Sequence, residues 1–308
     1  MNKVNNNKKK LLVSFSGGET SAYMAQWLWN NKQDEYEMIF VFANTGEEME
    51  QTLDFANKCS EYFGFPLVWI EGVFHKEVGK GTTHKIVSLE TASRNGEPFE
   101  DHISTYGIPN QANPQCTNEL KAIPIKSYAR SLLWKKYYTA IGIRVDEIDR
   151  IDSRRKEKRF YYPLCEDHPK TKPEINRYWK DMPFRLELKG YQGNCKWCWK
   201  KSRAKLLRIA KDNPEHFDFP KKMEAKYGNY FPEHRLKEWI KKGKPVPKDI
   251  KFFRNNTSSQ DIINAAKNAD PIIHDDSKDY DIQRSLLNYD ETESCEVFSQ
   301  CGNEIDDF

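Results

Sequence analysis

One stretch near the N-terminus decides the fold: Leu11-Leu12-Val13-Ser14-Phe15-Ser16-Gly17-Gly18-Glu19-Thr20-Ser21. It begins as a short apolar run, turns at two glycines and leads into residues 19–31, where apolar side chains recur at helical spacing. Glycines allow a tight turn and a close approach to an anion, because no Cβ blocks either. The first N–H groups of the following helix lack partners within the helix and can bind that anion. The stretch therefore predicts a strand, a phosphate-binding loop and a helix.

Short hydroxyl side chains at Ser16, Thr20 and Ser21 would add hydrogen-bond donors to this loop. The loop lacks the lysine of the G-x-x-x-x-G-K motif found in the common nucleoside triphosphatases. A capped turn without any ligand is the structural alternative. The position of the loop between a strand and a helix favours phosphate binding over this alternative.

Strands and helices alternate beyond this stretch. The predicted strands are residues 37–43, 66–70 and 138–143, and the predicted helices are residues 47–63 and 122–134. This spacing implies parallel strands with right-handed crossovers, and hence an α/β fold with a twisted, mainly parallel sheet flanked by helices. Residues 73–115 break the alternation, and so long an irregular segment in a compact domain is more often functional than idle.

The charges are unevenly distributed along the 308 residues. Residues 270–308 hold 12 acidic and 2 basic residues, whereas residues 151–210 hold 17 basic and 7 acidic ones. Such a basic excess is typical of surfaces that meet phosphates, although a solvated lysine-rich face gives the same count. We therefore expect four parts: a disordered arm (1–10), a nucleotide-binding α/β domain (11–150), a basic, cysteine-containing helical subdomain (151–230) and an extended, acidic, mobile tail (231–308).

Two of the seven cysteines, Cys195 and Cys198, form a C-x-x-C pair. Two thiolates at this spacing can hold one tetrahedral metal ion, and Cys116 and Cys165 are the candidates for the remaining ligands. Four thiolates suit Zn²⁺ or an iron–sulfur cluster, and nearby lysines such as Lys196 favour an anionic cluster. Without a metal, the pair would be a redox couple or inert. The odd number of cysteines, with no secretory signal pattern, indicates a reducing compartment.

Four motifs lie in order within residues 11–230: Ser14-Phe15-Ser16-Gly17-Gly18-x-Thr20-Ser21, Asn44-Thr45-Gly46, Cys116-Thr117-x-x-Leu120-Lys121-x-x-Pro124 and Gly142-Ile143-Arg144-x-Asp146-Glu147. Each is short, but together they resemble the phosphoadenosine phosphosulfate (PAPS) reductase family. This family belongs to the adenine nucleotide α-hydrolase (PP-loop ATP pyrophosphatase) superfamily and is often found in phage and bacterial genomes. The resemblance implies a flavodoxin-like fold with a nucleotide at the carboxyl ends of the strands.

The resemblance also implies roles for individual residues. The phosphates of ATP or PAPS would be held by Ser14, Ser16, Gly17, Gly18, Glu19, Thr20 and Ser21. The adenine or ribose would face the end of the second strand at Ala43, Asn44, Thr45 and Gly46, and the nucleotide site would include Gly142, Asp146 and Glu147. Lys121 and Arg144 would be catalytic cationic clamps, because a transferring phosphoryl or sulfuryl group needs fixed positive charge.

Two activities are compatible with this resemblance: reduction of a sulfonucleotide after thiol attack on its sulfuryl group, and activation of ATP at its α-phosphate with release of pyrophosphate. Some relatives carry a [4Fe–4S] cluster near the nucleotide, held by a Cys-Cys pair and a distant C-x-x-C. This chain has Cys116-Thr117 instead, so Cys165 would substitute. Glu19 stands where many relatives have Lys or another residue, which leaves the choice between ATP and PAPS open.

The acidic end of the chain departs from the family pattern. Classical members carry a C-terminal Glu-Cys-Gly segment followed by His, whereas this chain has Gln300-Cys301-Gly302 and no such His. Acidic neighbours also raise the pKa of a thiol. We therefore expect Cys301 to be an exposed thiol rather than the nucleophile, and no function is assigned to Cys295.

Two further functions remain open. The basic residues 151–210, with Tyr161, Tyr162, Trp197 and Trp199 as stacking surfaces, would let an enzyme of this class modify tRNA or DNA. Alternatively, the chain would be a non-enzymatic phage protein that binds nucleotide and a partner. No apolar run approaches the length of a membrane span, so we expect no membrane partner and a location in the bacterial cytoplasm, or in the host cytoplasm if a phage encodes the chain.

Overall fold

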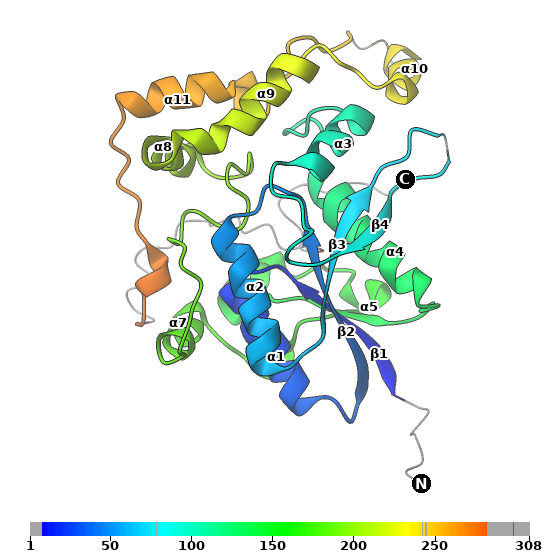
Figure 1. Cartoon of the computed structure of the whole chain (residues 1–308), viewed down its shortest axis with the longest axis vertical. Coiled ribbons are helices and arrows are strands. Elements are labelled where there is room, and N and C mark those ends of the chain that lie inside the picture. The colour runs from blue at the N-terminus through cyan, green and yellow to red at the C-terminus, as the bar shows by residue number, and fades with distance from the viewer. Residues whose placement is uncertain (1–7, 78, 242, 244, 282–297, 299–308) are drawn as a thin grey trace.

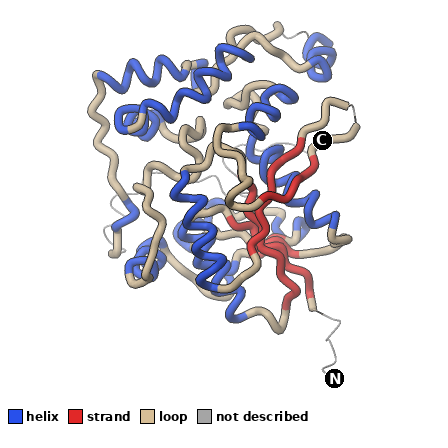
Figure 2. The backbone as a smooth tube through the Cα atoms, viewed as in Figure 1, coloured by secondary structure: helices blue, strands red, loops and turns tan. Residues whose placement is uncertain are grey.

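The computed structural model describes residues 8–77, 79–241, 243, 245–281 and 298. Six strands form one sheet in the order β4-β3-β2-β1-β5-β6, and all neighbours are parallel except β3 and β4. The strands are β1 (Lys9–Phe15), β2 (Tyr36–Asn44), β3 (Leu67–Val73), β4 (Thr83–Val87), β5 (Tyr138–Ala140) and β6 (Phe160–Tyr161). Figure 2 shows the strands together among the helices. The prediction of an α/β fold with a mainly parallel sheet is confirmed.

Successive residues of β1 pack on opposite faces of the sheet, as the pleat of a strand requires. Leu11, Val13 and Phe15 belong to one core and Leu12 to another. The first core is covered by α1 (Glu19–Asn31), α2 (Glu50–Phe63) and α7 (Lys172–Lys180), and the second by α4 (Ile123–Ser131). Figure 1 shows α1 and α2 on one side of the sheet and α4 on the other.

A third core lies beyond the carboxyl ends of the strands and is built from helices. Its helices are α3 (Glu97–Tyr106), α8 (Arg203–Asp212), α9 (Asp218–Tyr227) and α11 (Ser259–Lys267), and α10 (Glu233–Lys241) lies at its outer end (Figure 1). Trp197, Phe217 and Phe252 are completely buried in this core. We call it the helical core.

Shorter helical segments connect these elements. They are α5 (Arg155–Lys158), α6 (Pro163–Glu166), a π-helix η1 (Asn118–Ala122) and the 3₁₀ segments η2 (Val145–Arg150), η3 (Pro214–Phe217), η4 (Arg254–Asn256) and η5 (Asp276–Lys278). In the described part of the chain, no helix combines the length and the apolar character needed to cross a membrane.

The helix predicted at residues 19–31 coincides with α1, but two other helices are shorter than expected. The one predicted at 47–63 begins at Glu50, because its N-cap Met49 has an extended backbone with φ −66° and ψ 141°. The one predicted at 122–134 ends at Ser131, because Leu133 has a φ of +60°. At the N-terminus, β1 already begins at Lys9, within the predicted arm, and residues 1–7 lie outside the described part.

Within the tail predicted from residue 231, Phe252-Phe253 and residues 262–266 are the apolar segments expected to dock on the body, and the structure places them in the helical core. Phe252, Phe253 and Ile262 are buried in the helical core, where α11 packs against α8 and α9. Although Ile240, Val246 and Ile272 of this segment are exposed, its buried apolar residues share one core, so a low apolar content does not prevent it from folding. The rest of the predicted tail, including Cys295 and Cys301, lies outside the described residues.

Candidate functional site

The winding of the sheet reverses next to β1. The chain moves from β1 to β2 and β3 on one side, and β5 then pairs with β1 on the other side. Open α/β sheets bind ligands outside the carboxyl ends of the strands at such a reversal. Residues 16–21 follow β1 and residues 141–144 follow β5. A Cβ added to Gly142 would lie 3.3 Å from Ser21 Cα, so these two segments are in direct contact.

The loop after β1 has the conformation that the two glycines predict. Gly17 has a φ of +84°, and a Cβ there would lie 2.6 Å from Thr52 Cγ2. Gly18 is the N-cap of α1, and no side chain caps the helix. The Ser21 hydroxyl accepts a hydrogen bond from the Ser16 N–H (3.2 Å) and donates one to the Gly18 carbonyl (2.9 Å). The opening of α1 is therefore held by the loop itself, and its first N–H groups are not used for a side-chain cap.

The Glu19 carboxylate, which the sequence places inside this loop, is neutralised by Arg185. The guanidinium Nε and Nη2 donate to its two oxygens at 3.0 and 3.1 Å. Burial raises the pKa of Glu19, and the bond to Arg185 opposes that shift. Trp179 Nε1 also donates to the Glu19 carbonyl (3.0 Å). Sequence reasoning missed Arg185, although an acidic residue beside a phosphate loop is itself a signal that a cation lies nearby.

Arg144 joins the segment after β5 to the start of α1. Its Nη1 donates to Thr20 Oγ1 at 3.0 Å, and its Nε donates to Asp146 Oδ1 at 3.0 Å. Its Nη1 also lies 3.2 Å from Glu147 Oε2, and Glu147 forms a second ion pair with Arg150. The predicted residues Arg144, Asp146 and Glu147 thus come together beside the loop, with the guanidinium fixed by two carboxylates.

The motif after β2 is held by neighbouring loops. Asn44 Nδ2 donates to Glu71 Oε1 (2.7 Å) and to the Ser93 carbonyl (2.9 Å). Gly46, with its positive φ, lies against Gly96, whose N–H donates to the Gly46 carbonyl at 2.9 Å. Ala43 and the predicted phosphate ligand Ser14 are buried within their strands, and the Ser14 hydroxyl has no partner.

Glu48 connects two of the predicted motif residues, Thr45 and Lys121. Its carboxylate accepts hydrogen bonds from the Thr45 N–H (2.8 Å) and the Thr45 hydroxyl (2.8 Å), and it lies 3.2 Å from Lys121 Nζ. Lys121 belongs to the π-helix η1, a helix form that occurs frequently at functional sites. The predicted cation Lys121 is therefore positioned beside the end of β2 by a carboxylate that sequence reasoning missed.

The C-x-x-C turn lies against the end of β2. The Glu47 carbonyl accepts a hydrogen bond from the Lys196 N–H at 3.1 Å, and the Glu47 carboxylate accepts one from Trp197 Nε1. Glu47 is buried, and burial raises its pKa to about 7. Asn194, directly before the turn, donates from Nδ2 to the Ser16 carbonyl at 2.6 Å. Sequence reasoning missed both residues, because the contact of Glu47 with Trp197 and that of Asn194 with Ser16 form only in the folded chain.

The four predicted metal ligands do not form one site in the described structure. Among the described residues, no three His, Cys, Asp or Glu side chains form a group that could hold a metal ion. Cys116 packs on the helical core, whereas Cys165 packs beside Ile143, donates from Sγ to its carbonyl (3.2 Å) and has its pKa raised to about 11 by burial. Burial also raises the pKa of Cys195, whose carbonyl accepts a hydrogen bond from Lys201 Nζ at 2.8 Å.

The aromatic residues proposed to stack on nucleic-acid bases are in the interior. Tyr161, Tyr162, Trp197 and Trp199 are all at least nine-tenths buried. That expectation is wrong for these side chains, because aromatic residues among charges can equally be the core face of an element whose other face is charged. The basic residues Lys156, Lys158 and Arg159 of the same segment are exposed.

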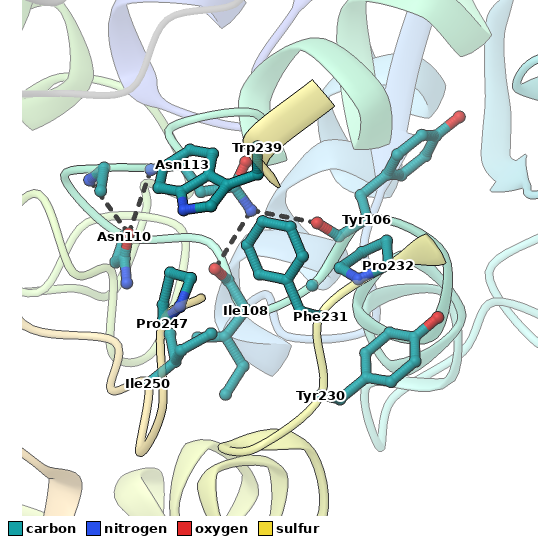
Figure 3. A pocket seen from close by; sticks show the side chains of 12 residues that line it. Tyr106, Ile108, Asn110, Asn113, Tyr230, Phe231, Pro232, Trp239, Pro247 and Ile250 are labelled. Carbon is teal, nitrogen blue, oxygen red and sulfur yellow. Dashed lines mark hydrogen bonds between the residues drawn. The ribbon is translucent and has the colours of Figure 1, made fainter. Parts of the chain in front are cut away.

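A separate apolar pocket lies between the end of α3 and the segment around α10 (Figure 3). It encloses about 410 Å³ of empty space, part of it open to solvent. Rings of Tyr106, Phe231 and Trp239 line it, and Asn113 Nδ2 donates to the carbonyls of Tyr106 and Ile108 at 3.2 Å each (Figure 3). The predicted functional segment 73–115 thus forms one of its walls, but none of the lining residues belongs to the four motifs.

Fold and site together define the class: an α/β protein whose glycine-rich loop lies at the winding reversal of a mainly parallel sheet. The chain is 31% identical to the uncharacterized nin region protein ORF290 of Escherichia phage lambda over 205 residues, which are 65% of this chain and 69% of that protein. It belongs to the family of that phage protein. No protein-family model matches the chain.

Two uncharacterized proteins of Methanocaldococcus jannaschii are also similar. MJ0066 is 24% identical over 255 residues, which are 77% of this chain, and MJ0973 is 26% identical over 221 residues, which are 67% of it. The matched regions span 45% of the length of each archaeal relative.

Proposed function

We propose that this protein is an adenine-nucleotide enzyme of the PAPS reductase family, with a flavodoxin-like fold that binds ATP or PAPS at the loop of residues 16–21. The observation that carries the proposal is the position of this loop at the winding reversal, where α1 opens without a side-chain cap. Backbone N–H groups at such a helix terminus bind anions, because they are unpaired and lie at the positive end of the helix dipole.

The residues around the loop have complementary roles in this proposal. The hydroxyl of Thr20 and the N–H groups of the first turn of α1 hold the phosphates. Arg144, fixed by Asp146 and Glu147, supplies positive charge beside Thr20 without losing energy to reorganisation. Lys121, fixed by Glu48, supplies the second cation near the end of β2, where the adenosine would lie.

Two reactions are compatible with this arrangement. With ATP, a nucleophilic substrate attacks the α-phosphorus, the bond to the bridging oxygen breaks, and pyrophosphate leaves. With PAPS, a thiolate supplied by a thiol reductant attacks the sulfuryl sulfur, the bond from that sulfur to the phosphate oxygen breaks, and adenosine 3′,5′-bisphosphate leaves. A second thiol then attacks the sulfur of the first thiol, which releases sulfite and joins the two thiols in a disulfide. In both reactions Arg144 and Lys121 offset the negative charge that develops on the transferred group and on the leaving group.

A cluster or zinc ion does not fit the donors as they are placed, since Cys165 lies with Ile143 and no three donors converge among the described residues. No step of the proposed reactions is therefore assigned to a metal. The [4Fe–4S] or Zn²⁺ site stays a prediction, which anaerobic purification followed by iron, sulfide and zinc analysis tests.

Calorimetric titration with ATP and with PAPS tests the proposed function. Gly18→Ala is the matched variant, because its backbone is in the extended region and an added Cβ meets nothing closer than 3.8 Å. The variant should fold as the wild type does, while its methyl group obstructs a phosphate at the mouth of the loop. Wild-type binding of either nucleotide, weakened at least about tenfold in Gly18→Ala, supports the proposal. Absence of binding to both nucleotides contradicts it, and binding without turnover of any thiol or nucleophile favours the non-enzymatic alternative.

A nucleic-acid substrate is the second candidate, and the exposed cations of α5 and of its C-cap Arg159 favour it. Lys156, Lys158 and Arg159 lie together at the edge of the sheet beside β6. They would contact a tRNA or DNA backbone, and affinity would then fall steeply as salt increases. Replacing all three by Ser should reduce the slope of log affinity against log salt by about 2–3. An unchanged slope would remove this segment from the interface.

A further inference from the structure

Asn194 contacts both loops of the candidate nucleotide site. Its side-chain Nδ2 donates to the Ser16 carbonyl at 2.6 Å, and its own carbonyl accepts a hydrogen bond from the Met49 N–H at 2.9 Å. Ser16 directly precedes the two glycines, and Met49 is the N-cap of α2. One residue therefore connects the loop after β1 with the loop after β2.

The bond to Ser16 fixes the direction of a particular N–H group. The Ser16 carbonyl and the Gly17 N–H belong to one planar trans peptide unit, so they point in opposite directions. Holding the carbonyl oxygen on the side of Asn194 therefore directs the Gly17 N–H to the other side. Glycine tolerates both signs of φ, so this peptide unit would otherwise rotate easily, and Gly17 itself has a φ of +84°.

Asn194 is held in place by the turn that follows it. Trp197, fully buried in the helical core, donates to the Glu47 carboxylate, and the Lys196 N–H donates to the Glu47 carbonyl. Lys201 Nζ donates to the Cys195 carbonyl at 2.8 Å. Because the backbone of the turn is held in this way, the Asn194 side chain loses little further conformational entropy when it binds Ser16. The bond to Ser16 therefore constrains the loop effectively.

We propose that Asn194 is a positioning residue for the phosphate loop: its carboxamide holds the Ser16–Gly17 peptide in the orientation that directs the Gly17 N–H toward a bound polyphosphate. This inference rests on the proposed function, because it assigns Asn194 to the same site. It also gives the C-x-x-C turn a role in nucleotide binding that requires no metal ion.

Asn194→Ala and Asn194→Asp test this role. Both remove the N–H donor, and the aspartate retains the shape of the side chain. Asn31→Ala is the matched control, since Asn31 Nδ2 also donates to a backbone carbonyl, that of Trp27 at 2.8 Å. This bond lies at the C-terminal end of α1, far from the loop that precedes the helix. Melting temperatures establish that all variants are folded. The measurements are affinities for tripolyphosphate, ATP and adenosine, and hydrogen–deuterium exchange of residues 14–22 without ligand.

The expected result is an affinity for tripolyphosphate and ATP about tenfold weaker in both Asn194 variants, with unchanged affinity for adenosine. Exchange in residues 14–22 should also be faster, and Asn31→Ala should show neither change. A purely structural role would weaken adenosine binding as well and would overturn the inference. So would wild-type exchange and wild-type ATP affinity in Asn194→Ala, a result that leaves the proposed function intact. A wild-type protein that binds neither polyphosphate nor nucleotide overturns the proposed function and this inference with it.

Discussion

The ammonium group of Lys121 lies 3.2 Å from the Glu48 carboxylate, and both side chains are largely shielded from solvent. The pair joins the π-helix η1 to the loop after β2, and Glu48 also binds Thr45 through two hydrogen bonds. Removing one partner of such a buried ion pair destabilises the folded protein strongly, because the remaining charge stays desolvated and has no counter-ion.

Lys121→Met is therefore expected to lower the free energy of unfolding by about 3 kcal/mol, because it leaves Glu48 without its buried counter-ion. Glu48→Gln combined with Lys121→Met should recover much of that loss, since no buried charge remains. Urea unfolding of the wild type, both single variants and the double variant measures the coupling. If the decreases in unfolding free energy of the two single variants add up to that of the double variant, the two charges do not stabilise each other.

Gly17→Ala should destabilise the protein for two separable reasons. The positive φ strains any L residue by about 1 kcal/mol, and the new methyl group would collide with Thr52 Cγ2. Gly64→Ala is the control, since Gly64 has a similar φ of +74° and open space around it. Thr52→Ser removes the colliding methyl group, so the Gly17→Ala/Thr52→Ser protein should lose less stability in urea unfolding than Gly17→Ala, with Phe42 Cε2 at 3.1 Å as the remaining close contact. Equal losses in Gly17→Ala and Gly64→Ala would disprove the collision.

Glu47 should make stability depend on pH near neutrality. Its folded-state pKa is raised to about 7 by burial, against 4.5 as the ordinary value. The folded protein therefore holds this proton more tightly than the unfolded chain does. The stabilising contribution is complete below about pH 4.5 and is lost as pH rises through about 7, an effect of up to about 3 kcal/mol. Glu47→Gln retains an oxygen that accepts from Trp197 Nε1, so the difference in unfolding free energy between wild type and variant should change across pH 4.5–7.5. A constant difference would contradict the assignment.

His102 should destabilise the folded state, and increasingly so in acid. Its ring is fully buried among Phe74, Phe99 and Tyr106, and neither ring nitrogen has a partner. Burial lowers its pKa to about 3, so stability is lost as pH falls from about 6.5 toward 3, where only the unfolded chain is protonated. His102→Leu should raise the free energy of unfolding by about 1 kcal/mol at pH 7 and by more at pH 5.

The matched control for that prediction is His75→Leu, because His75 Nε2 is bonded to Thr83 Oγ1 at 2.9 Å and is only partly buried. Melting curves of both variants at pH 5 and pH 7 should show the gain for His102→Leu alone. A gain of equal size at both pH values would indicate improved packing rather than the loss of a buried imidazole.

The sequence predicted the features of the fold that depend on residues close together in the chain. The bounds of α1 follow from a glycine turn and helical periodicity within about 20 residues, and the alternation of strands and helices predicted the parallel sheet. The convergence of the segments after β1, β2 and β5 could be expected once the topology was known, because parallel strands end at the same edge.

The partners of the site residues could not be predicted in this way. Arg185 and Asn194 come from distant segments, and no spacing rule links Arg185 with Glu19 across 166 residues. Glu48 adjoins the Asn44-Thr45-Gly46 motif, but its contact with Lys121 forms only in the folded chain. The prediction that Trp197 stacks on nucleic-acid bases was wrong for the same reason. A tryptophan between lysines is expected to be exposed unless its neighbours in the helical core are known. After residue 231 the sequence indicated which apolar segments, 252–253 and 262–266, dock on the body, but not that α11 packs against α8 and α9.

Phe252 packs against Trp197 with ring centroids 4.7 Å apart, which has a consequence for synthesis on the ribosome. All six strands of the sheet lie before residue 162, so the sheet can form while translation continues. The turn that carries Trp197 cannot complete its packing until residues 252–266 have emerged from the ribosome, because they form part of the helical core. During that interval the nascent chain exposes part of the helical core, so chaperone binding should be strongest in chains arrested after Trp197 has left the ribosome and before residues 252–266 have left it.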